Sequence, residues 1–372
     1  MKNIKKTGKN AFIGADNLKT ITVSGDNNED FMVDENGVLY DKEKKTMILF
    51  PNANNIEEYT IPASVTRIDC SFGNNLKKIS FEGLNNPKCS NHLFRNSNIG
   101  YLYIQNEYTT NNFCNFPVAR WNNDKTEAIV EGSCGSNCNL QFDVVSGQLT
   151  ISGNGQMLNY KEKEQPWYPY RNEIKEIIIE EGITSIGEYA FNDIKNLKKL
   201  VLAKGITKIG TKGISKCPQL ESITYPVSVT SFPDDLFEEC QSVREVQWIG
   251  TGKMPNFTET SYPMNNIKTT LEEVVIEEGI TAIGSYAFSS CKILENVQIG
   301  NTITSISNYA FYGCKSLPSI TIPDSVILLG SYAFEYCSSL ESTIIGDGVT
   351  SIGADAFAYC PKLTTVKIGK KK

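Results

Sequence analysis

The chain has 372 residues, with 36 Lys+Arg against 42 Asp+Glu and therefore a net charge of −6. This acidic balance argues against a nucleic-acid partner, which would favour a basic face. The single histidine, His92, argues against histidine triads, histidine proton shuttles and most zinc sites. No stretch approaches the ~20 apolar residues of a membrane span. The eleven cysteines are the other unusual count, and their placement matters for the interpretation.

Residues 1–125 contain divergent copies of a 23-residue pattern that is clearest later in the chain. One such copy, shortened by about three residues, runs from Val65 to Phe81. Before it lies the segment 31–51, in which Asn36-Gly37 separates two apolar runs. An Asn-Gly pair in this setting is a strong hairpin signal. The sequence therefore predicts divergent repeats with a β-hairpin insertion.

Residues 126–170 differ from the repeats on either side. They contain Cys134 and Cys138, the segment 140–157 and Pro166-Trp167. We interpret this stretch as a joining module, with a boundary near residue 125 and regular repeats over 171–372.

Seven frames of a 23-residue template follow, written V/I-x-x-I-G-x-x-A-F-x-x-C-x-x-L-x-x-I-x-I-x-x-x. Every step between frames is 23 residues except one of 51. Unbroken phase over seven frames is the signature of a repeat protein. The frames begin at Ile183, Ile206, Val229, Ile280, Ile303, Val326 and Val349.

A 23-residue unit cannot bury its own apolar face, so stacked copies must share one core. The L-x-x-I-x-I segment alternates and predicts a strand, and V/I-x-x-I predicts a second short strand. The x-x-A-F-x-x-C segment fits one helical or 3₁₀ turn on the outer side. The expected fold is thus an α/β leucine-rich repeat solenoid with a parallel concave sheet, short strands and one-turn helices outside.

The step of 51 residues contains a variant repeat near 250–279. Shifting the chain by 97 residues superimposes it on the joining module, and Ile179–Ile183 then matches Ile276–Ile280 identically. The step is therefore one frame of 23 plus one of 28. Because a strand precedes the next frame by the same interval in both copies, we expect no break in the sheet there.

These frames resemble the BspA-like leucine-rich repeat family of bacterial and parasitic-protist surface proteins. The likeness rests on the blocks ITSIGEYAF (183–191), ITAIGSYAF (280–288) and VTSIGADAF (349–357), with TIP-x-SV at 60–65 and 321–326. Hairpins like that at 31–51 and modules like that at 126–170 also occur in the family. The resemblance implies a non-enzymatic surface protein that adheres to host, matrix or neighbouring-cell proteins.

Six cysteines occupy one template slot, where Ile194 also stands. A slot that accepts isoleucine favours buried free thiols that act as small apolar side chains, over disulfides or metal ligation. The six are Cys217, Cys240, Cys291, Cys314, Cys337 and Cys360.

Cys134 and Cys138 are open to three interpretations. Zinc would need further ligands, a disulfide could join them to each other or one of them to Cys114, and they could be free. The pair is thus a possible disulfide.

Other candidates for chemistry are weak. Glu180-Glu181 and Glu277-Glu278 lie in turns where adjacent carboxylates point apart. Gly153-x-Gly155 lacks the third glycine of a dinucleotide motif, and Asp26–Asp30 fits a solvated loop. We expect no catalytic site, no cofactor and no metal.

A binding surface remains. In L-x-x-I-x-I the residue between the last two core positions faces outward, which gives a column of short, mostly uncharged side chains. Such a column fits a protein or glycan partner, although strands favour β-branched residues in any case. The column is Ile178, Val201, Thr224, Gln247, Val275, Gln298, Thr321, Ile344 and Lys367.

The sequence therefore predicts a monomeric, cell-surface or secreted protein that binds another protein through this face. The alternative is a structural spacer, or an intracellular scaffold, without a specific ligand. The first ten residues are charged throughout and do not form a secretory signal. A core strand ends at Ile368, directly before the final lysines. We therefore expect either that those lysines prevent pairing at the open edge of the sheet, or that the chain is a fragment of a longer array.

Overall fold

The fold is that of a computed structural model, which describes residues 7, 11–12, 15, 17–23, 29–73, 75–90, 93–94, 97, 99, 101–104, 108, 112–114, 116–121 and 128–369. The chain forms two compact units. Unit 1 comprises 1–134, 139–149 and 162–174, and unit 2 comprises 135–138, 150–161 and 175–372. The division into 1–125, 126–170 and 171–372 stays a prediction.

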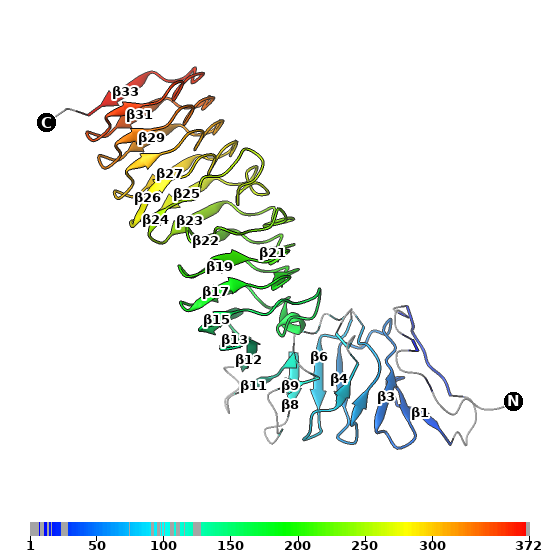
Figure 1. Cartoon of the computed structure of the whole chain (residues 1–372). Coiled ribbons are helices and arrows are strands. Elements are labelled where there is room, and N and C mark those ends of the chain that lie inside the picture. The colour runs from blue at the N-terminus through cyan, green and yellow to red at the C-terminus, as the bar shows by residue number, and fades with distance from the viewer. Residues whose placement is uncertain are drawn as a thin grey trace. The chain divides into compact units, whose positions relative to one another are not determined.

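Unit 2 is a solenoid of stacked turns, seen from green to red in Figure 1. Its first wall is a parallel sheet built from the L-x-x-I-x-I segments, one strand per turn. The strands are β16 (Glu176–Ile179), β19 (Lys199–Val201), β22 (Ser222–Pro226), β23 (Glu245–Ile249), β25 (Glu273–Ile276) and β27 (Asn296–Ile299), followed in a separate sheet by β29 (Ser319–Ile322), β31 (Ser342–Ile345) and β33 (Thr365–Ile368).

The second wall is built mainly from the V/I-x-x-I segments, which form the short strands that the sequence predicts. They pair in two parallel sheets, one of three strands and one of five. The first contains β15 (Gly155–Gln156), β17 (Ile183–Ile186) and β20 (Lys208–Ile209), and the second contains β24 (Gly252–Lys253), β26 (Ile280–Ile283), β28 (Ser305–Ile306), β30 (Leu328–Leu329) and β32 (Ser351–Ile352). Of these strands, β15 and β24 come from the Gly-x-Gly segments.

The core runs along the axis of the stack, with every slot packed on its own copy in the next turn. The register is strict: Ile177 pairs with Leu200 in β16 and β19, and Leu200 pairs with Ile223. Phe311 stacks between Phe288 and Phe334, with ring centroids 5.1 Å from each. Burying one such ring contributes roughly 1.5–3 kcal/mol. The apolar positions of the template are therefore the residues that form this core.

The expected one-turn helices on the outer side are wrong. Among the described residues the only helix is η1 (Tyr168–Tyr170), a 3₁₀ turn in unit 1. The outer segments of unit 2 form β-turns instead, and their third wall includes the paired strands β18 (Phe191–Asn192) and β21 (Ile214–Ser215). The physical reason is a left-handed backbone at two positions per turn, such as Tyr309 (φ +59°) and Gly313 (φ +69°), which a right-handed helix does not admit.

Hydrogen bonds between turns take the place of those within a helix. In the outer wall from Tyr286 to Ala358, N–H groups of alternate residues donate to carbonyls of the following turn. Phe288 donates to Ala310 at 2.8 Å, and Phe311 donates to Ala333 at 2.8 Å. Because Ala310 and Phe311 share one peptide group, these bonds join into a continuous chain of amides along the stack. The same holds for the chains that begin at Tyr286 and Ser290.

The variant repeat leaves the first wall unbroken, as expected. Strand β23 pairs in register with β22 on one side and with β25 on the other, and β25 pairs with β27. The extra residues bulge away from this wall. Phe257 of the insertion packs beside Trp248, with ring centroids 6.5 Å apart, so the insertion adds to the core.

The first wall is interrupted one turn later, which the sequence analysis did not foresee. Elsewhere the residue before each strand donates its N–H to the equivalent residue of the preceding turn, as Glu295 does to Glu272 and Glu341 does to Pro318. Proline has no N–H to donate. Pro318, just before β29, therefore removes this bond between the turns of β27 and β29.

Unit 1 contains shorter turns of the same kind. Its two parallel arrangements are β3-β5-β7 and β4-β6-β8-β11, and antiparallel strands flank both. The strands are β1 (Phe31–Val33), β2 (Leu39–Asp41), β3 (Thr46–Leu49), β4 (Glu58–Ile61), β5 (Arg67–Ile68), β6 (Lys78–Phe81), β7 (Lys88–Cys89), β8 (Tyr101–Ile104), β9 (Asn112–Phe113), β10 (Phe116–Pro117) and β11 (Ala119–Trp121), and the joining stretch adds β12 (Ala128–Gly135), β13 (Cys138–Asp143) and β14 (Gln148–Gly153).

The predicted hairpin insertion is confirmed by the antiparallel pairing of β1 with β2. Its loop spans 34–38, longer than the two-residue turn that Asn36-Gly37 indicates. Asp34 closes the loop, since its Oδ1 accepts the N–H of Val38 at 2.8 Å. Its Oδ2 accepts the hydroxyl of Tyr59 at 2.5 Å, and Tyr59 also bonds the hydroxyl of Tyr40. One carboxylate thus ties the insertion to the repeat behind it.

The phenylalanine stack generates a stability prediction. Phe311→Ala should lower the free energy of unfolding by about 3–5 kcal/mol, because the ring lies between two others and leaves a cavity. Phe357→Ala should cost less, because Phe357 has one ring partner and is partly exposed. Urea unfolding of both variants measures the difference, and equal losses would contradict the shared-core account.

Candidate binding surface

The proposed column lies on the first wall, at one register position of successive strands. Direct backbone pairing links most members to the next: Ile178 to Val201, Val201 to Thr224, Thr224 to Gln247, Gln247 to Val275 and Val275 to Gln298. Thr321 pairs with Ile344, and Ile344 with Lys367. The structure therefore brings these nine residues into two rows, of six and three, that are separated where Pro318 interrupts the wall.

Exposure rises along the column. The members from Ile178 to Val275 are half-buried by their neighbours, whereas Gln298, Thr321, Ile344 and Lys367 are exposed. Ile344 retains 44% of its accessible surface. The later turns of unit 2 therefore offer the more accessible part of this face.

Polar members of the column are engaged within the chain. The Gln247 side-chain amide donates to Glu277 at 2.6 Å, and that of Gln298 donates to Glu273 at 3.2 Å. Thr224 donates to the Gln247 side-chain oxygen at 3.5 Å. These bonds fix the orientations of the Gln247 and Gln298 amides on this face.

Charged residues flank the column and largely pair across turns. Lys199 contacts Glu176 at 3.0 Å, Lys198 contacts Glu221 at 3.5 Å, and Arg244 pairs with Glu272. These pairs are exposed, and such pairs contribute only about 0–1 kcal/mol each. They set the polarity of the rim more than they stabilise the fold.

The cysteine ladder is confirmed as free thiols. Five of its members are buried and Cys360 is partly exposed, and Cys70 is a seventh free cysteine. Four ladder thiols donate to the phenylalanine-slot carbonyl of the preceding turn, among them Cys314 to Phe288 at 3.3 Å and Cys337 to Phe311 at 3.4 Å. The slot therefore uses both the small volume and the weak S–H donor of cysteine.

Cys360 differs from the other free thiols because it is partly exposed. A hydrogen bond from Cys337 lowers the pKa of Cys360, as one from Cys217 does for the buried Cys240, whereas burial raises the pKa of Cys291 to about 12. A thiolate is the reactive form of cysteine. Cys360, both accessible and more acidic, is thus the thiol with the highest expected reactivity.

This leads to a labelling prediction. Iodoacetamide at neutral pH should modify Cys360 rapidly and leave the other thiols unmodified while the protein is folded. Mass spectrometry should find seven modified cysteines in denaturant without reductant. Cys360→Ser should abolish the rapid phase, and a rapid phase that survives in this variant would contradict the assignment.

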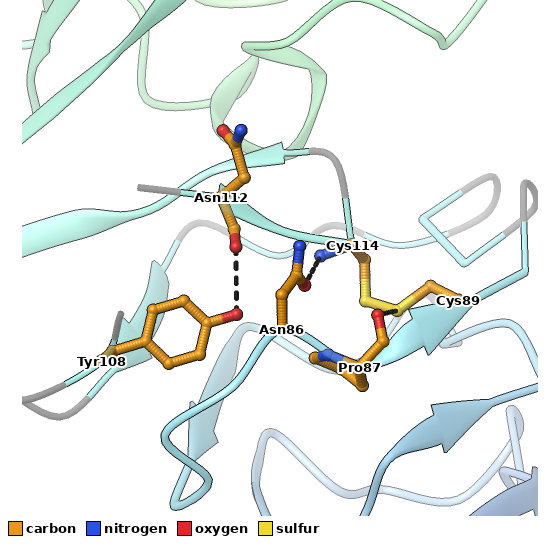
Figure 2. The surroundings of a disulfide bond; sticks show 6 residues. All are labelled: Asn86, Pro87, Cys89, Tyr108, Asn112 and Cys114. Atoms are coloured by element: carbon orange, nitrogen blue, oxygen red, sulfur yellow. Dashed lines mark hydrogen bonds between the residues drawn. A yellow bond between two sulfur atoms is a disulfide. The ribbon is translucent and has the colours of Figure 1, made fainter. Parts of the chain in front are cut away.

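A disulfide joins Cys89 of β7 to Cys114, with a Cα–Cα distance of 5.3 Å (Figure 2). Asn86 supports it by accepting the N–H of Cys114 at 2.8 Å, and Tyr108 donates to the carbonyl of Asn112 at 3.0 Å. The alternative that Cys114 bonds Cys134 or Cys138 is therefore wrong. The latter two are buried and are not among the free thiols; a bond between them stays a prediction.

Cys89 is a disulfide cysteine that the repeat pattern did not indicate. A separation of 25 residues from Cys114 is close to one repeat and places the two in neighbouring turns, which is the signal that could have revealed it. The repeats of unit 1 are so divergent that this one-repeat spacing could not be recognised.

Closing a loop of 25 residues restricts the unfolded chain by about 3–4 kcal/mol. The double variant Cys89→Ser/Cys114→Ser should lose roughly that much stability in unit 1, measured by chemical denaturation. Reduction of the unsubstituted protein should give at least this loss, because it also breaks any bond between Cys134 and Cys138.

The paired glutamates have a structural role. The second member of each pair accepts a backbone N–H from the next turn: Glu181 from Lys204 at 3.3 Å, and Glu278 from Asn301 at 2.8 Å. Asn256 does the same for Ser285 at 2.9 Å. His92 and most of Asp26–Asp30 lie outside the described residues.

No group of three or more His, Cys, Asp or Glu is arranged to hold a metal within the part of the chain that the structure describes. In that same part, no helix is long and apolar enough to cross a membrane.

Several solved structures share weak similarity with the chain. A leucine-rich repeat protein from Eubacterium ventriosum is 22% identical, with 65% of this chain and 85% of that chain covered and a TM-score of 0.26. A leucine-rich cell surface protein from Faecalibacterium prausnitzii is 16% identical, with 94% and 95% covered and a TM-score of 0.31. A leucine-rich repeat protein from Bacteroides ovatus is 14% identical, with 91% of this chain and 92% of that chain covered and a TM-score of 0.37.

No curated protein matches the chain. A family model described as a BspA type leucine-rich repeat region, of six copies, matches residues 46–154, 167–259 and 260–372. These three segments cover most of the sequence, including both units. The chain therefore belongs to the BspA-type leucine-rich repeat family.

Proposed function

We propose that this protein is a non-enzymatic interaction module, cell-surface or secreted, that binds another protein through the first wall of unit 2. The observation that carries the proposal is the column itself. Its short, little-charged side chains stand in register on a sheet and become exposed toward Thr321, Ile344 and Lys367. Family membership adds support, because leucine-rich repeats commonly serve as protein-binding scaffolds.

The disulfide Cys89–Cys114 supports the extracellular location. Disulfides form and persist in oxidising compartments and are rare in the cytosol. The buried ladder thiols are compatible with such a compartment, since a thiol that stays protonated and inaccessible reacts slowly. We propose a host, matrix or neighbouring-cell protein as partner, a glycan as the alternative ligand, and a monomeric state.

The second candidate is a spacer without a specific ligand. It is favoured by the bonds of Gln247 to Glu277 and of Gln298 to Glu273, because side chains already satisfied within the chain have less to offer a partner. The two candidates predict different effects of a charged substitution in the column: it should weaken binding only if the column is the interface.

The test compares two exposed isoleucines that lie at different walls of unit 2. Ile344 lies in the column and is 44% exposed, and Ile327 lies beside the second wall and is 52% exposed. We expect Ile344→Arg to weaken binding at least about tenfold, because a central charge must be desolvated in the interface. Ile327→Arg, the matched control, should bind as the unsubstituted protein does.

Surface plasmon resonance against a panel of purified extracellular-matrix proteins provides the measurement. Absence of binding to every member of the panel, with both variants folded, would favour the spacer. Equal binding by Ile344→Arg and the unsubstituted chain would show that the column is not the interface.

A further inference from the structure

Six tyrosines gather on the outer wall of unit 2, away from the column. Tyr286, Tyr309 and Tyr332 occupy one slot in three successive turns and form a parallel stack with centroid distances of 4.8 and 4.7 Å. A second stack joins Tyr336 to Tyr359 at 4.7 Å. Tyr312 contacts both stacks edge-on, with centroids 5.7 Å from Tyr309 and 5.6 Å from Tyr336.

The first stack ends at Tyr332. One face of this ring is covered by Tyr309, and the same slot of the next turn holds Asp355 in place of a fourth tyrosine. Asp355 is exposed and Tyr332 is half-buried. An aromatic face carries negative electrostatic potential and attracts cations, and here a carboxylate lies beside it.

A second carboxylate lies within this cluster. Glu335 follows Tyr332 by one β-turn, its N–H donating to the Tyr332 carbonyl at 3.3 Å, and it retains only 7% of its accessible surface. Its side chain has no hydrogen bond and no ion pair among the described residues. Desolvating an unpaired carboxylate is unfavourable. The Glu335 oxygens are not among the fully buried atoms that lack a partner, so this carboxylate is open to a cation from outside.

Electrostatics supports the same conclusion. Burial raises the pKa of Glu335, and the negative charge of Asp355 raises it further. The Glu335 charge in turn acts on Tyr309, Tyr312 and Cys360, which places it among the rings. In the described part of the chain, no lysine or arginine pairs with either carboxylate or lies over one of these six rings.

We propose that Tyr332, Glu335, Tyr336 and Asp355, named here the stack end, bind a cationic side chain, arginine or lysine, from a partner protein. The cation would contact the uncovered Tyr332 face and neutralise the two carboxylates together. This site lies on a different wall from the column and does not depend on it, so either could be wrong without the other.

The test compares two short peptides that differ in charge alone. The acetylated and amidated peptide Gly-Arg-Gly carries the cation, and its counterpart with citrulline has nearly the same shape and no charge. Peptide-observed NMR titrations measure both dissociation constants with the full chain. The arginine peptide should bind at least about tenfold more tightly, and equal binding would overturn the proposal.

Matched substitutions locate the site. Glu335→Gln should reduce binding of the arginine peptide to the level of the citrulline peptide, and Tyr332→Leu should weaken it severalfold. Tyr286→Leu, at the far end of the same stack, and Glu341→Gln, an exposed carboxylate elsewhere, are the controls and should change nothing. An unchanged dissociation constant in Glu335→Gln would refute the assignment.

Thermal unfolding of the free protein gives an independent readout. Glu335→Gln removes an unpaired charge from a desolvated position, so its melting temperature should equal or exceed that of the unsubstituted chain. A clearly lower melting temperature would mean that the carboxylate stabilises the fold, and the proposal would then fail. This readout does not require the Tyr332→Leu variant.

Discussion

The structure depends on one constraint: each strand must pair with the equivalent strand of the next turn. A turn of 23 residues has no interior by itself, and its strands are too short to persist alone. Because each strand pairs in register with the strand of the next turn, each apolar slot meets the same slot above and below. Rings such as Phe288, Phe311 and Phe334 therefore stack, and one residue type recurs down each column.

The constraint also explains how the array tolerates irregularity. An insertion such as that near 250–279 is harmless as long as the next strand arrives in phase, because only the pairing residues must match. A single proline has a larger effect than the whole insertion. Pro318 removes one N–H at a pairing position and separates β27 from β29, whereas the insertion leaves β23, β25 and β27 paired.

Sequence reasoning recovers the features that apolar periodicity records. The two short strands per turn, the buried cysteine slot and the outward column all follow from which positions alternate, and the structure places them accordingly. The outer wall could not be recovered this way. Its x-x-A-F-x-x-C segment has the spacing of a helical turn, and the left-handed backbone of Tyr309 or Tyr336 leaves no trace in a sequence where tyrosine, lysine and aspartate all occupy those positions.

Long-range pairings of irregular parts were equally hidden. Cys89 lies in a frame too degraded to show which slot it fills, so its bond to Cys114 could not be inferred from pattern. The stack end was missed for a different reason. Its residues occupy variable template positions, which a consensus discards, although a binding site is where copies of a repeat are free to differ. The residues at these variable positions, Glu335 and Asp355, were thus more informative about chemistry than the positions that agree with the template.

The amide chains of the outer wall have an electrical consequence. In an ordinary sheet the peptide dipoles largely cancel, but here successive peptide groups, such as those of Phe288, Phe311 and Phe334, donate in one direction along the stack. Their dipoles add as they do in an α-helix, with N–H groups directed toward later turns and carbonyls toward earlier ones. The outer wall from Tyr286 to Ala358 is therefore polarised along the stack, in the sense opposite to a helix, and each further turn of this kind would extend that polarity.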